Sequence, residues 1–252
     1  MIYDLQKASM WKRISAFLFD TILFGIVAVL LALALSAALG YDRYARTLSD
    51  AFARYGEEYN VDLANTYDLS ALDEEERAHL EEAVDAFNAD PDAVRAYAMS
   101  IQLTLVIVSI ALLLASLGME FVIPLLYGNG QTLGKKIFGL GVMHVDGVKL
   151  RPVALFVRAI LGKYTIEIMV PVLIVLMLYW NTIGIVGPVV LLAILIVQIA
   201  VLIGTRTNSV IHDLLATTVV VDLPSQMIFD TREDMIEYKK RIHAEQAARQ
   251  PY

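Results

Sequence analysis

The chain has 252 residues, of which 58% are apolar and only 19% are charged, and its net charge is −7. Soluble domains contain about 45–50% apolar and about 25% charged residues, so this composition excludes an ordinary soluble globule. The absence of cysteine excludes disulfides, thiolate nucleophiles and cysteine-bound metals. The acidic balance gives no support to nucleic-acid binding.

Four apolar runs are each close to the roughly 20 residues that a helix needs to cross a bilayer. They comprise residues 14–40, 101–127, 164–180 and 183–204. The first run could be a cleavable signal peptide, but it is about twice as long as a signal core and contains Asp20. We therefore expect a retained first helix and an all-α membrane protein built as a four-helix transmembrane bundle.

Lysine and arginine indicate which segments face the cytoplasm. They precede the first run, lie between the second and third runs, and follow the fourth. Both termini are therefore expected in the cytoplasm of a multi-pass protein of the cell membrane. Arg43 and Arg46, just after the first run, oppose this rule.

The segment 41–99 holds 15 acidic residues and five arginines, a formal charge of −10. We expect it to be an acidic helical insert on the extracytoplasmic side. Ser70 and the acidic residues after it predict the start of an amphipathic helix. Asp90-Pro91 predicts the N-cap of a second helix that continues into the second run. The predicted apolar face of the first helix comprises Leu72, Leu80, Val84 and Phe87.

Strand patterns follow the second run. Apolar residues alternate with polar or small ones up to Asp146-Gly147, a dipeptide typical of type I′ turns, which predicts a small cytoplasmic β-hairpin. The β-branched segment 217–221 is too short to span a membrane and predicts a third strand beside it. Pro152 predicts the start of an amphipathic helix that lies along the interface or enters it, and Pro171 is expected to kink the third run.

Three acidic residues fall inside apolar runs, where an ionised side chain is costly unless it has a partner or a function. They are Asp20, Glu120 and Glu167. The first two lie roughly 10 Å from the cytoplasmic ends of their runs, and Glu167 enters from the same side. We therefore expect the three to converge near the cytoplasmic leaflet, with Arg13 close to Asp20 and too little positive charge to balance them all. This predicts a cation or proton site, or alternatively a packed polar cluster that fixes the register of the helices.

Two other motifs give weaker indications of a chemical function. Residues 128–136 look like a phosphate-binding loop, but the glycine spacing is wrong and a membrane helix precedes them instead of a strand. In His212-Asp213 the carboxylate could orient the imidazole, yet nothing around it is typical of a hydrolase, so a structural role is expected. We predict no catalytic residue, metal site or cofactor, and no enzyme activity.

Three stretches, residues 12–20, 130–140 and 212–216, resemble the RDD family of membrane proteins. The arginine and two aspartates that name the family match Arg13, Asp20 and Asp213, and the glycine-glutamine-threonine-leucine-glycine-lysine stretch matches residues 130–135. The resemblance covers residues 8–222 apart from the insert, and leaves residues 223–252 as a cytoplasmic tail. Thr217 stands where the family frequently has glycine. The resemblance marks five supporting residues: Gln131, Thr132, Lys135, Arg158 and His212.

The resemblance implies the fold more strongly than an activity, because most family members have no assigned function and sodium/proton exchange is proposed for some. Two functions are therefore expected from different classes. Arg13, Asp20 and Asp213 are expected to form a polar network at the cytoplasmic leaflet. The first function is movement of a cation, proton or small solute, with Asp20 and Glu120 as ligands or proton carriers and Arg13 as a competing internal cation. The alternative is a membrane scaffold or assembly factor whose network is purely structural. Beyond the lipid bilayer, a second copy of the chain or another membrane protein is the expected partner, since four helices leave little room for an aqueous path.

Overall fold

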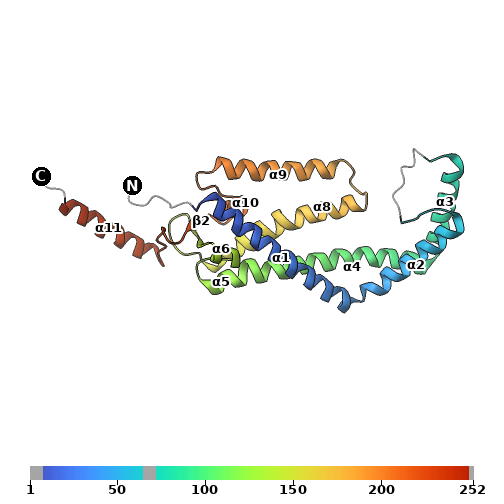
Figure 1. Cartoon of the computed structure of the whole chain (residues 1–252), viewed down its shortest axis with the longest axis horizontal. Coiled ribbons are helices and arrows are strands. Elements are labelled where there is room, and N and C mark those ends of the chain that lie inside the picture. Colours follow the sequence, from blue (N-terminus) through green and yellow to red (C-terminus); the bar gives the residue numbers. More distant parts are fainter. Residues whose placement is uncertain (1–7, 65–71, 250–252) are drawn as a thin grey trace. The chain divides into compact units, whose positions relative to one another are not determined.

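The computed structural model describes residues 8–64 and 72–249 of the chain (Figure 1). Within these ranges, four helices are long and apolar enough to cross a membrane. We refer to them as spans one to four: Met10–Leu39, Pro91–Tyr127, Pro152–Tyr179 and Val186–Gly204. Each contains most of one predicted apolar run, which confirms a mostly helical protein with four candidate membrane spans.

The chain forms two compact units, which are described separately. The core unit comprises Met1–Ala28 and Leu112–Tyr252, and the inserted unit comprises Val29–Ala111. Both unit boundaries fall within helices. The inserted unit therefore contains the predicted acidic insert together with the adjoining parts of spans one and two.

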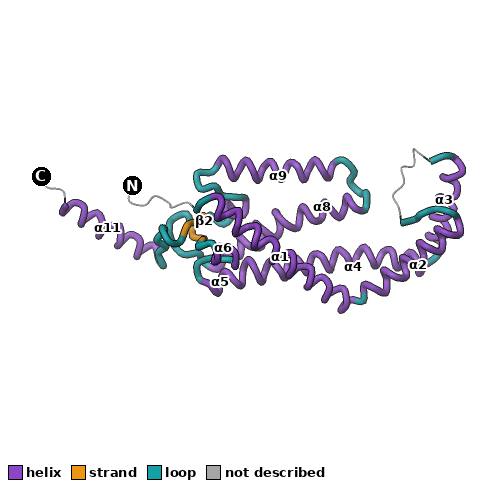
Figure 2. The backbone as a smooth tube through the Cα atoms, in the orientation of Figure 1, coloured by secondary structure: helices purple, strands orange, loops and turns teal. Residues whose placement is uncertain are grey.

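All four spans are helical (Figure 2). Two of them are not α-helical throughout. Span one is α1 (Met10–Leu39) and span four is α9 (Val186–Gly204). Span two consists of α4 (Pro91–Ser116), the π-helix η1 (Leu117–Val122) and α5 (Ile123–Tyr127). Span three consists of α7 (Pro152–Phe156), the π-helix η2 (Val157–Met169) and α8 (Val170–Tyr179). In the core unit, α8 and α9 lie side by side and run antiparallel (Figure 1).

Both π-helices end immediately before a proline-containing turn. Pro124 lies in the first turn of α5, and Pro171 lies in the first turn of α8. A proline has no N–H to donate and its ring crowds the preceding turn of an α-helix, which favours the wider i→i+5 turn at these places. The distortion expected at Pro171 is therefore a long π-helical segment before it.

The sheet of the core unit joins two segments that are distant in sequence. β1 (Leu140–His144) pairs antiparallel with β2 (Thr218–Asp222), and Val142 lies opposite Val220. Leu140, Val142 and Val220 pack on one face of the sheet with Ala8 and Ala16, and Met143, Val219 and Val221 pack on the other with Ile228. Both faces are therefore buried, as the β-branched composition of these strands favours.

The predicted hairpin does not form the sheet. The strand paired with β1 is β2, and not the segment that follows Asp146-Gly147. After β1 the chain does turn at Asp146-Gly147, but Asp146 lacks the positive φ that a type I′ turn needs, and only Gly147 has one, +89°. The returning arm forms a single bridge, Met143 to Lys149, because the Lys149 N–H donates to the Phe229 carbonyl. The predicted third strand is correctly placed, but it is the direct partner of β1.

The start of a helix predicted at Pro152 is confirmed. The helix continues from α7 through η2 into α8 and so forms one span with the third apolar run. After span four come the short α10 (Ile211–Leu215), β2 and α11 (Arg232–Arg249). Between spans two and three lies α6 (Leu133–Ile137), with Thr132 as its N-cap.

The inserted unit contains a helix that the sequence analysis did not identify. α2 (Tyr41–Tyr59) begins directly after Gly40, whose φ of +68° separates it from α1. Leu48, Phe52 and Tyr55 of α2 pack with buried Ala51, Phe87 and Ala93. The heptad-like spacing of these apolar positions is the signal that could have predicted it.

The two helices predicted in the insert are present. α3 (Glu74–Ala89) is capped by Asp73, whose carboxylate accepts from the Glu76 N–H; Ser70 lies outside the described residues. The apolar face is shifted from the prediction, since Val84 is 41% exposed whereas Ala83 and Phe87 are buried. Asp90 caps α4 as predicted, and its Oδ1 accepts from the N–H of Asp92 at 2.9 Å.

Candidate functional site

Eight charged side chains lie close together in the core unit and form what we name the polar cluster. They are Arg13, Asp20, Glu120, Lys135, Arg158, Lys163, Glu167 and Asp213. Four are carboxylates and four are cations, so the formal charges cancel. The expectation of too little positive charge is therefore wrong, because Lys135, Arg158 and Lys163 lie close to the acids in addition to Arg13.

Within the part of the chain that the structure describes, both hydrogen-bond donors to Asp20 of span one are neutral. Its Oδ2 accepts the Thr132 hydroxyl at 2.5 Å, and its Oδ1 accepts the Gly134 N–H at 2.7 Å. The side chain is 4% exposed. A Cβ at Gly134 would lie 2.5 Å from the Ala16 carbonyl oxygen, so only glycine allows α6 to approach span one this closely. The threonine and second glycine of the signature stretch thus bind the first aspartate.

Gln131 has a different role in the same stretch. It is buried, and its Nε2 donates to the Leu140 carbonyl at 2.7 Å. This bond attaches the loop before α6 to the start of β1. Gln131 therefore positions the loop.

Asp213 of α10 contacts two arginines, Arg158 and Arg13. Its Oδ1 accepts from Arg158 Nε at 3.0 Å and from the Thr218 hydroxyl at 2.9 Å. Burial is the largest single influence and acts to raise the pKa of Asp213, but the charges and hydrogen bonds around the carboxylate, led by the positive charge of Arg158, together outweigh burial and hold that pKa well below its usual range. Its Oδ2 is buried without a hydrogen-bond partner among the described residues.

Arg13 pairs with Asp213 and not with Asp20, which corrects the expectation from helix spacing. Arg13 Nη2 lies 4.0 Å from Asp213 Oδ2, and Nη1 donates to the Thr207 carbonyl at 3.2 Å. The residues that name the signature therefore form two separate contacts. Asp20 binds the α6 loop, whereas Arg13 and Asp213 connect span one with the segment after span four.

His212 is oriented by Glu167. Glu167 Oε2 lies 2.7 Å from His212 Nδ1, and its Oε1 accepts the His212 backbone N–H at 3.1 Å. On the other side of the ring, Arg158 Nη2 lies 3.0 Å from Nε2. Because a guanidinium can only donate, Nε2 must accept, and the ring hydrogen is on Nδ1 and donated to Glu167. The expectation that Asp213 orients the ring is corrected, since it lies 3.8 Å from Nε2.

Glu120 forms an ion pair with Lys163, which joins η1 of span two to η2 of span three. The three acids predicted to converge therefore have different partners: Asp20 has Thr132 and Gly134, Glu120 has Lys163, and Glu167 has His212. In residues 8–64 and 72–249, no group of three or more histidine and acidic side chains could hold a metal ion. The acids share a neighbourhood but not a ligand set.

The π-helix η2 explains why Arg158, Lys163 and Glu167 all reach the polar cluster. In an α-helix of about 3.6 residues per turn, residues nine apart lie two and a half turns apart and on opposite sides. In η2 the Val170 N–H bonds to the Thr165 carbonyl five residues earlier, so nine residues make about two turns. Spacings of five and nine therefore place all three residues on one face.

Lys135 is half-buried and has no ion pair within the described part of the chain. Its Nζ donates to Thr132 Oγ1 at 3.3 Å, which places it beside the Asp20 carboxylate. Burial and the positive charge of Arg158 lower the pKa of Lys135 to about 8. The charge of Lys163 also lowers the pKa of Lys135, whereas the charges of Glu120 and Asp20 raise it.

The family model of the RDD family matches residues 7–217 of the chain. The chain belongs to the RDD family. This is a family of membrane proteins, which agrees with the four apolar spans. Searches of curated proteins and of solved structures found no match. Arg13, Asp20, Lys135 and Asp213 all lie within the part that matches.

One departure of this RDD protein from the family pattern has a visible conformational consequence. Thr217 has a φ of +55°, in the left-handed region that favours glycine. Its N–H donates to the Leu214 carbonyl, and its carbonyl accepts the Val145 N–H. The turn from α10 into β2 thus retains the backbone shape of a glycine although a β-branched residue occupies it.

Proposed function

We propose that this RDD protein exchanges a monovalent cation for a proton at the corner of the polar cluster formed by Asp20, Thr132 and Lys135. One observation carries the proposal. A buried carboxylate, whose two hydrogen-bond donors in residues 8–64 and 72–249 are neutral, lies beside a half-buried lysine whose pKa is lowered to about 8. We name this place the Asp20 corner.

The charge balance supports exchange at this corner and not elsewhere in the cluster. Asp213 has Arg158, and Glu120 has Lys163, as direct ion-pair partners. Asp20 depends on Lys135 for a nearby positive charge. When Lys135 loses its proton, the cluster becomes negative by one charge, and a cation bound at Asp20 restores neutrality. The carboxylate and the Thr132 hydroxyl are oxygen ligands suited to a hard ion such as sodium.

The competition has a defined direction with pH. Below about pH 8 Lys135 carries its proton and occupies the electrostatic position that the cation needs. Above about pH 8 the proton leaves and cation binding strengthens. Sodium should therefore bind more tightly as the pH rises through this value, and binding should release a proton.

The proposal includes an orientation in the cell membrane. The positive-inside rule supports both termini on the cytoplasmic side, so that the Asp20 corner loads from the cytoplasm and residues 41–99 face outward. Exchange needs neither a cofactor nor an enzymatic step. Because four helices enclose little space, we propose that a second copy of the chain completes the path.

Proteoliposomes loaded with a pH-sensitive dye test the exchange. An inward sodium gradient should raise the internal pH, whereas choline should not. Asp20→Asn and Lys135→Met should each abolish the response, and Lys136→Met serves as the matched control, because Lys136 is exposed and lies over the Tyr127 ring at 3.7 Å. The proposal would be contradicted if the internal pH of vesicles with the parent protein did not respond to sodium. Exchange that survives both substitutions would also contradict it.

A scaffold or assembly role is the second candidate, and a specific observation favours it. The contacts of Asp213 connect Arg13 of span one and Arg158 of span three, as a purely structural clamp would. In that case Asp20→Asn and Lys135→Met should lower the amount of folded protein in the membrane. Normal abundance and thermal stability with lost exchange would instead favour transport.

A further inference from the structure

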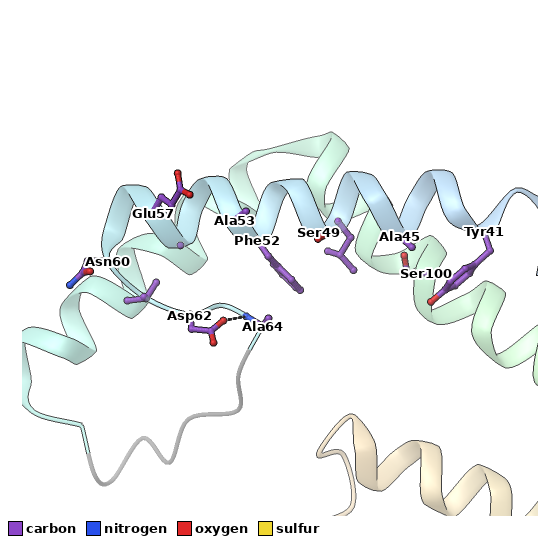
Figure 3. A pocket seen from close by; sticks show the side chains of 13 residues that line it. Tyr41, Ala45, Ser49, Phe52, Ala53, Glu57, Asn60, Asp62, Ala64 and Ser100 are labelled. Atoms are coloured by element: carbon purple, nitrogen blue, oxygen red, sulfur yellow. Dashed lines mark hydrogen bonds between the residues drawn. The ribbon is translucent and has the colours of Figure 1, made fainter.

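Two places in the molecule contain polar groups that the proposed exchange does not use. In the inserted unit, a groove of about 760 Å³ runs along α2 (Figure 3). The Glu57 side chain points away from Phe52, so this carboxylate and the apolar wall do not face one ligand. In the core unit, by contrast, Arg158 contacts both His212 and Asp213 directly. The polar groups that meet in one place are therefore those around Arg158.

The guanidinium of Arg158 divides its hydrogen bonds between two acceptors. Its Nε donates to Asp213 Oδ1 at 3.0 Å, and its Nη2 donates to His212 Nε2 at 3.0 Å. Two neighbouring N–H groups of a guanidinium match the two oxygens of one carboxylate, and such a bidentate pair is stronger than a single hydrogen bond. Here only one of the two N–H groups bonds to the carboxylate.

The second oxygen of that carboxylate is an available acceptor. Asp213 is 1% exposed, and its Oδ2 has no hydrogen-bond partner in residues 8–64 and 72–249. Arg13 Nη2 lies 4.0 Å from this oxygen, which is too long for a hydrogen bond. A buried charged oxygen without a partner is costly. Transfer of Arg158 Nη2 to Oδ2 would remove that cost and complete the bidentate pair.

The neutral ring of His212 keeps Arg158 Nη2 in its present position. The ring donates its Nδ1 hydrogen to Glu167 Oε2 at 2.7 Å, and the lone pair of Nε2 accepts from Nη2. A second proton can therefore bind to the ring only at Nε2. Two N–H groups would then face each other at 3.0 Å, so Nη2 has to leave. The new N–H has an acceptor within a short movement, because Asp213 Oδ1 lies 3.8 Å away.

The backbone at His212 is fixed, so the guanidinium is the part that moves. A Cβ at Gly162 would lie 2.6 Å from the Cβ of His212, which shows how closely η2 and α10 approach. The His212 N–H donates to Glu167 Oε1 at 3.1 Å, and the preceding N–H, of Ile211, donates to Gln198 Oε1 at 3.4 Å. The guanidinium of Arg158, by contrast, lies at the end of a long side chain with several rotatable bonds.

The charges around the ring allow a second proton. Glu167 and Arg158 face the ring from η2, Asp213 follows it in α10, and Arg13 of span one lies beyond Asp213. Among the described residues, α9 and β2 add no titratable group to these contacts. Two carboxylates and two arginines thus surround the ring. Imidazole is the side chain whose charge ordinarily changes between about pH 5 and pH 8.

We propose that His212 is a second proton-binding site of the polar cluster, and that its protonation transfers Arg158 Nη2 from His212 Nε2 to Asp213 Oδ2. In the neutral state Arg158 bonds to both residues. In the protonated state Arg158 and Asp213 form a bidentate pair, and the imidazolium pairs with Glu167. The proton changes the formal charge of the cluster from zero to +1. This site is separate from the Asp20 corner and does not depend on cation exchange there.

Magic-angle-spinning NMR of the full chain in lipid vesicles tests both parts, with ¹⁵N in histidine and arginine and ¹³C in aspartate. The chain has four histidines, so the triple variant His79→Gln/His144→Gln/His243→Gln retains only the His212 signal. At about pH 9 this signal should show a protonated Nδ1 and an unprotonated Nε2, and by about pH 5 Nε2 should be protonated. Over the same interval, the dipolar coupling between an arginine Nη and an aspartate carboxylate carbon should increase.

His212→Gln separates the proton from other effects of pH. Its side-chain oxygen can still accept from Arg158 but takes no proton, so the increase in coupling should be lost. His243→Gln is the matched control, at an exposed position of α11, and should behave as the parent.

Three results would overturn the proposal. The first is a His212 ring that stays neutral at about pH 5 in the folded chain, and the second is a ring hydrogen on Nε2 instead of Nδ1 at about pH 9. The third is a coupling that does not change with pH in the triple variant. The triple variant leaves His212 intact, so these outcomes can be read even if His212→Gln does not fold.

Discussion

The Gly134 N–H donates to Asp20 Oδ1 at 2.7 Å, and a Cβ on Gly134 would lie 2.9 Å from that same oxygen. The hydrogen bond and the missing side chain are thus two requirements of one contact. It joins span one to the loop after span two, which are more than 100 residues apart. The first aspartate and the glycine-rich stretch of the family signature are therefore one structural feature.

Gly134→Ala should destabilise the protein strongly. The added methyl would collide with the Ala16 backbone carbonyl and with the Asp20 carboxylate, which its hydrogen bonds to Thr132 and Gly134 hold in place. Overpacking of this kind costs about 1–3 kcal/mol. The melting temperature in detergent measures the effect. Gly25→Ala in span one is the control, since a Cβ there meets nothing within 4 Å, and equal shifts for the two variants would contradict this explanation.

Arg158→Met should be among the most damaging single substitutions. It leaves Asp213 buried without its closest cation and removes the donor to His212 Nε2. Loss of one partner from a buried ion pair costs about 3–5 kcal/mol. Arg158→Lys should rescue little, because one ammonium cannot replace the two directed bonds of the guanidinium.

The measurement is the yield and melting temperature of the purified variants. Arg151→Met, at an exposed arginine just before span three, should leave both nearly unchanged. In the double variant Arg158→Met/Asp213→Asn, the uncompensated charge is removed, so part of the stability should return. A double variant as unstable as the sum of the two single changes would show that the charge pair is not the cause.

Lys135 should make stability rise with pH in alkaline solution. Its pKa is about 8 in the folded chain, below the ordinary lysine value of 10.5, so between these pH values the unfolded chain binds the extra proton. Stability increases with pH wherever the unfolded state holds more protons. Relative to Lys135→Met, the melting temperature of the parent should therefore rise between about pH 8 and pH 10.5. The melting temperature of Lys136→Met should change with pH as that of the parent does. If the melting temperatures of the parent and of Lys135→Met changed with pH in parallel, Lys135 would not be the cause.

Thr217→Gly should stabilise the protein. The threonine has a φ of +55°, which costs a β-branched residue roughly 1 kcal/mol and glycine very little. The side chain is exposed, so little packing is lost. Thr218→Gly, at the next position, should instead destabilise, because Thr218 is buried and its hydroxyl donates to Asp213. Chemical or thermal unfolding of the two variants checks both signs.

Several features could be predicted from the sequence because they depend on local properties. The four spans follow from the length and hydropathy of single runs, and the Asp90 cap follows from a residue type before a proline. Asp20 and Glu120 could be selected because any charge within an apolar run is costly. The family resemblance added Arg13 and Asp213 through short motifs.

The choice of partner for each charge was decided only by the tertiary structure. Arg13 contacts Asp213, 200 residues away, and β1 pairs with β2 across the whole of spans three and four. Such contacts depend on how distant segments pack, and no local pattern contains that information. Arg158 and Glu167 face the same way because η2 replaces the α-helical period with i→i+5 turns, so any argument from a spacing of 3.6 residues places them on opposite sides.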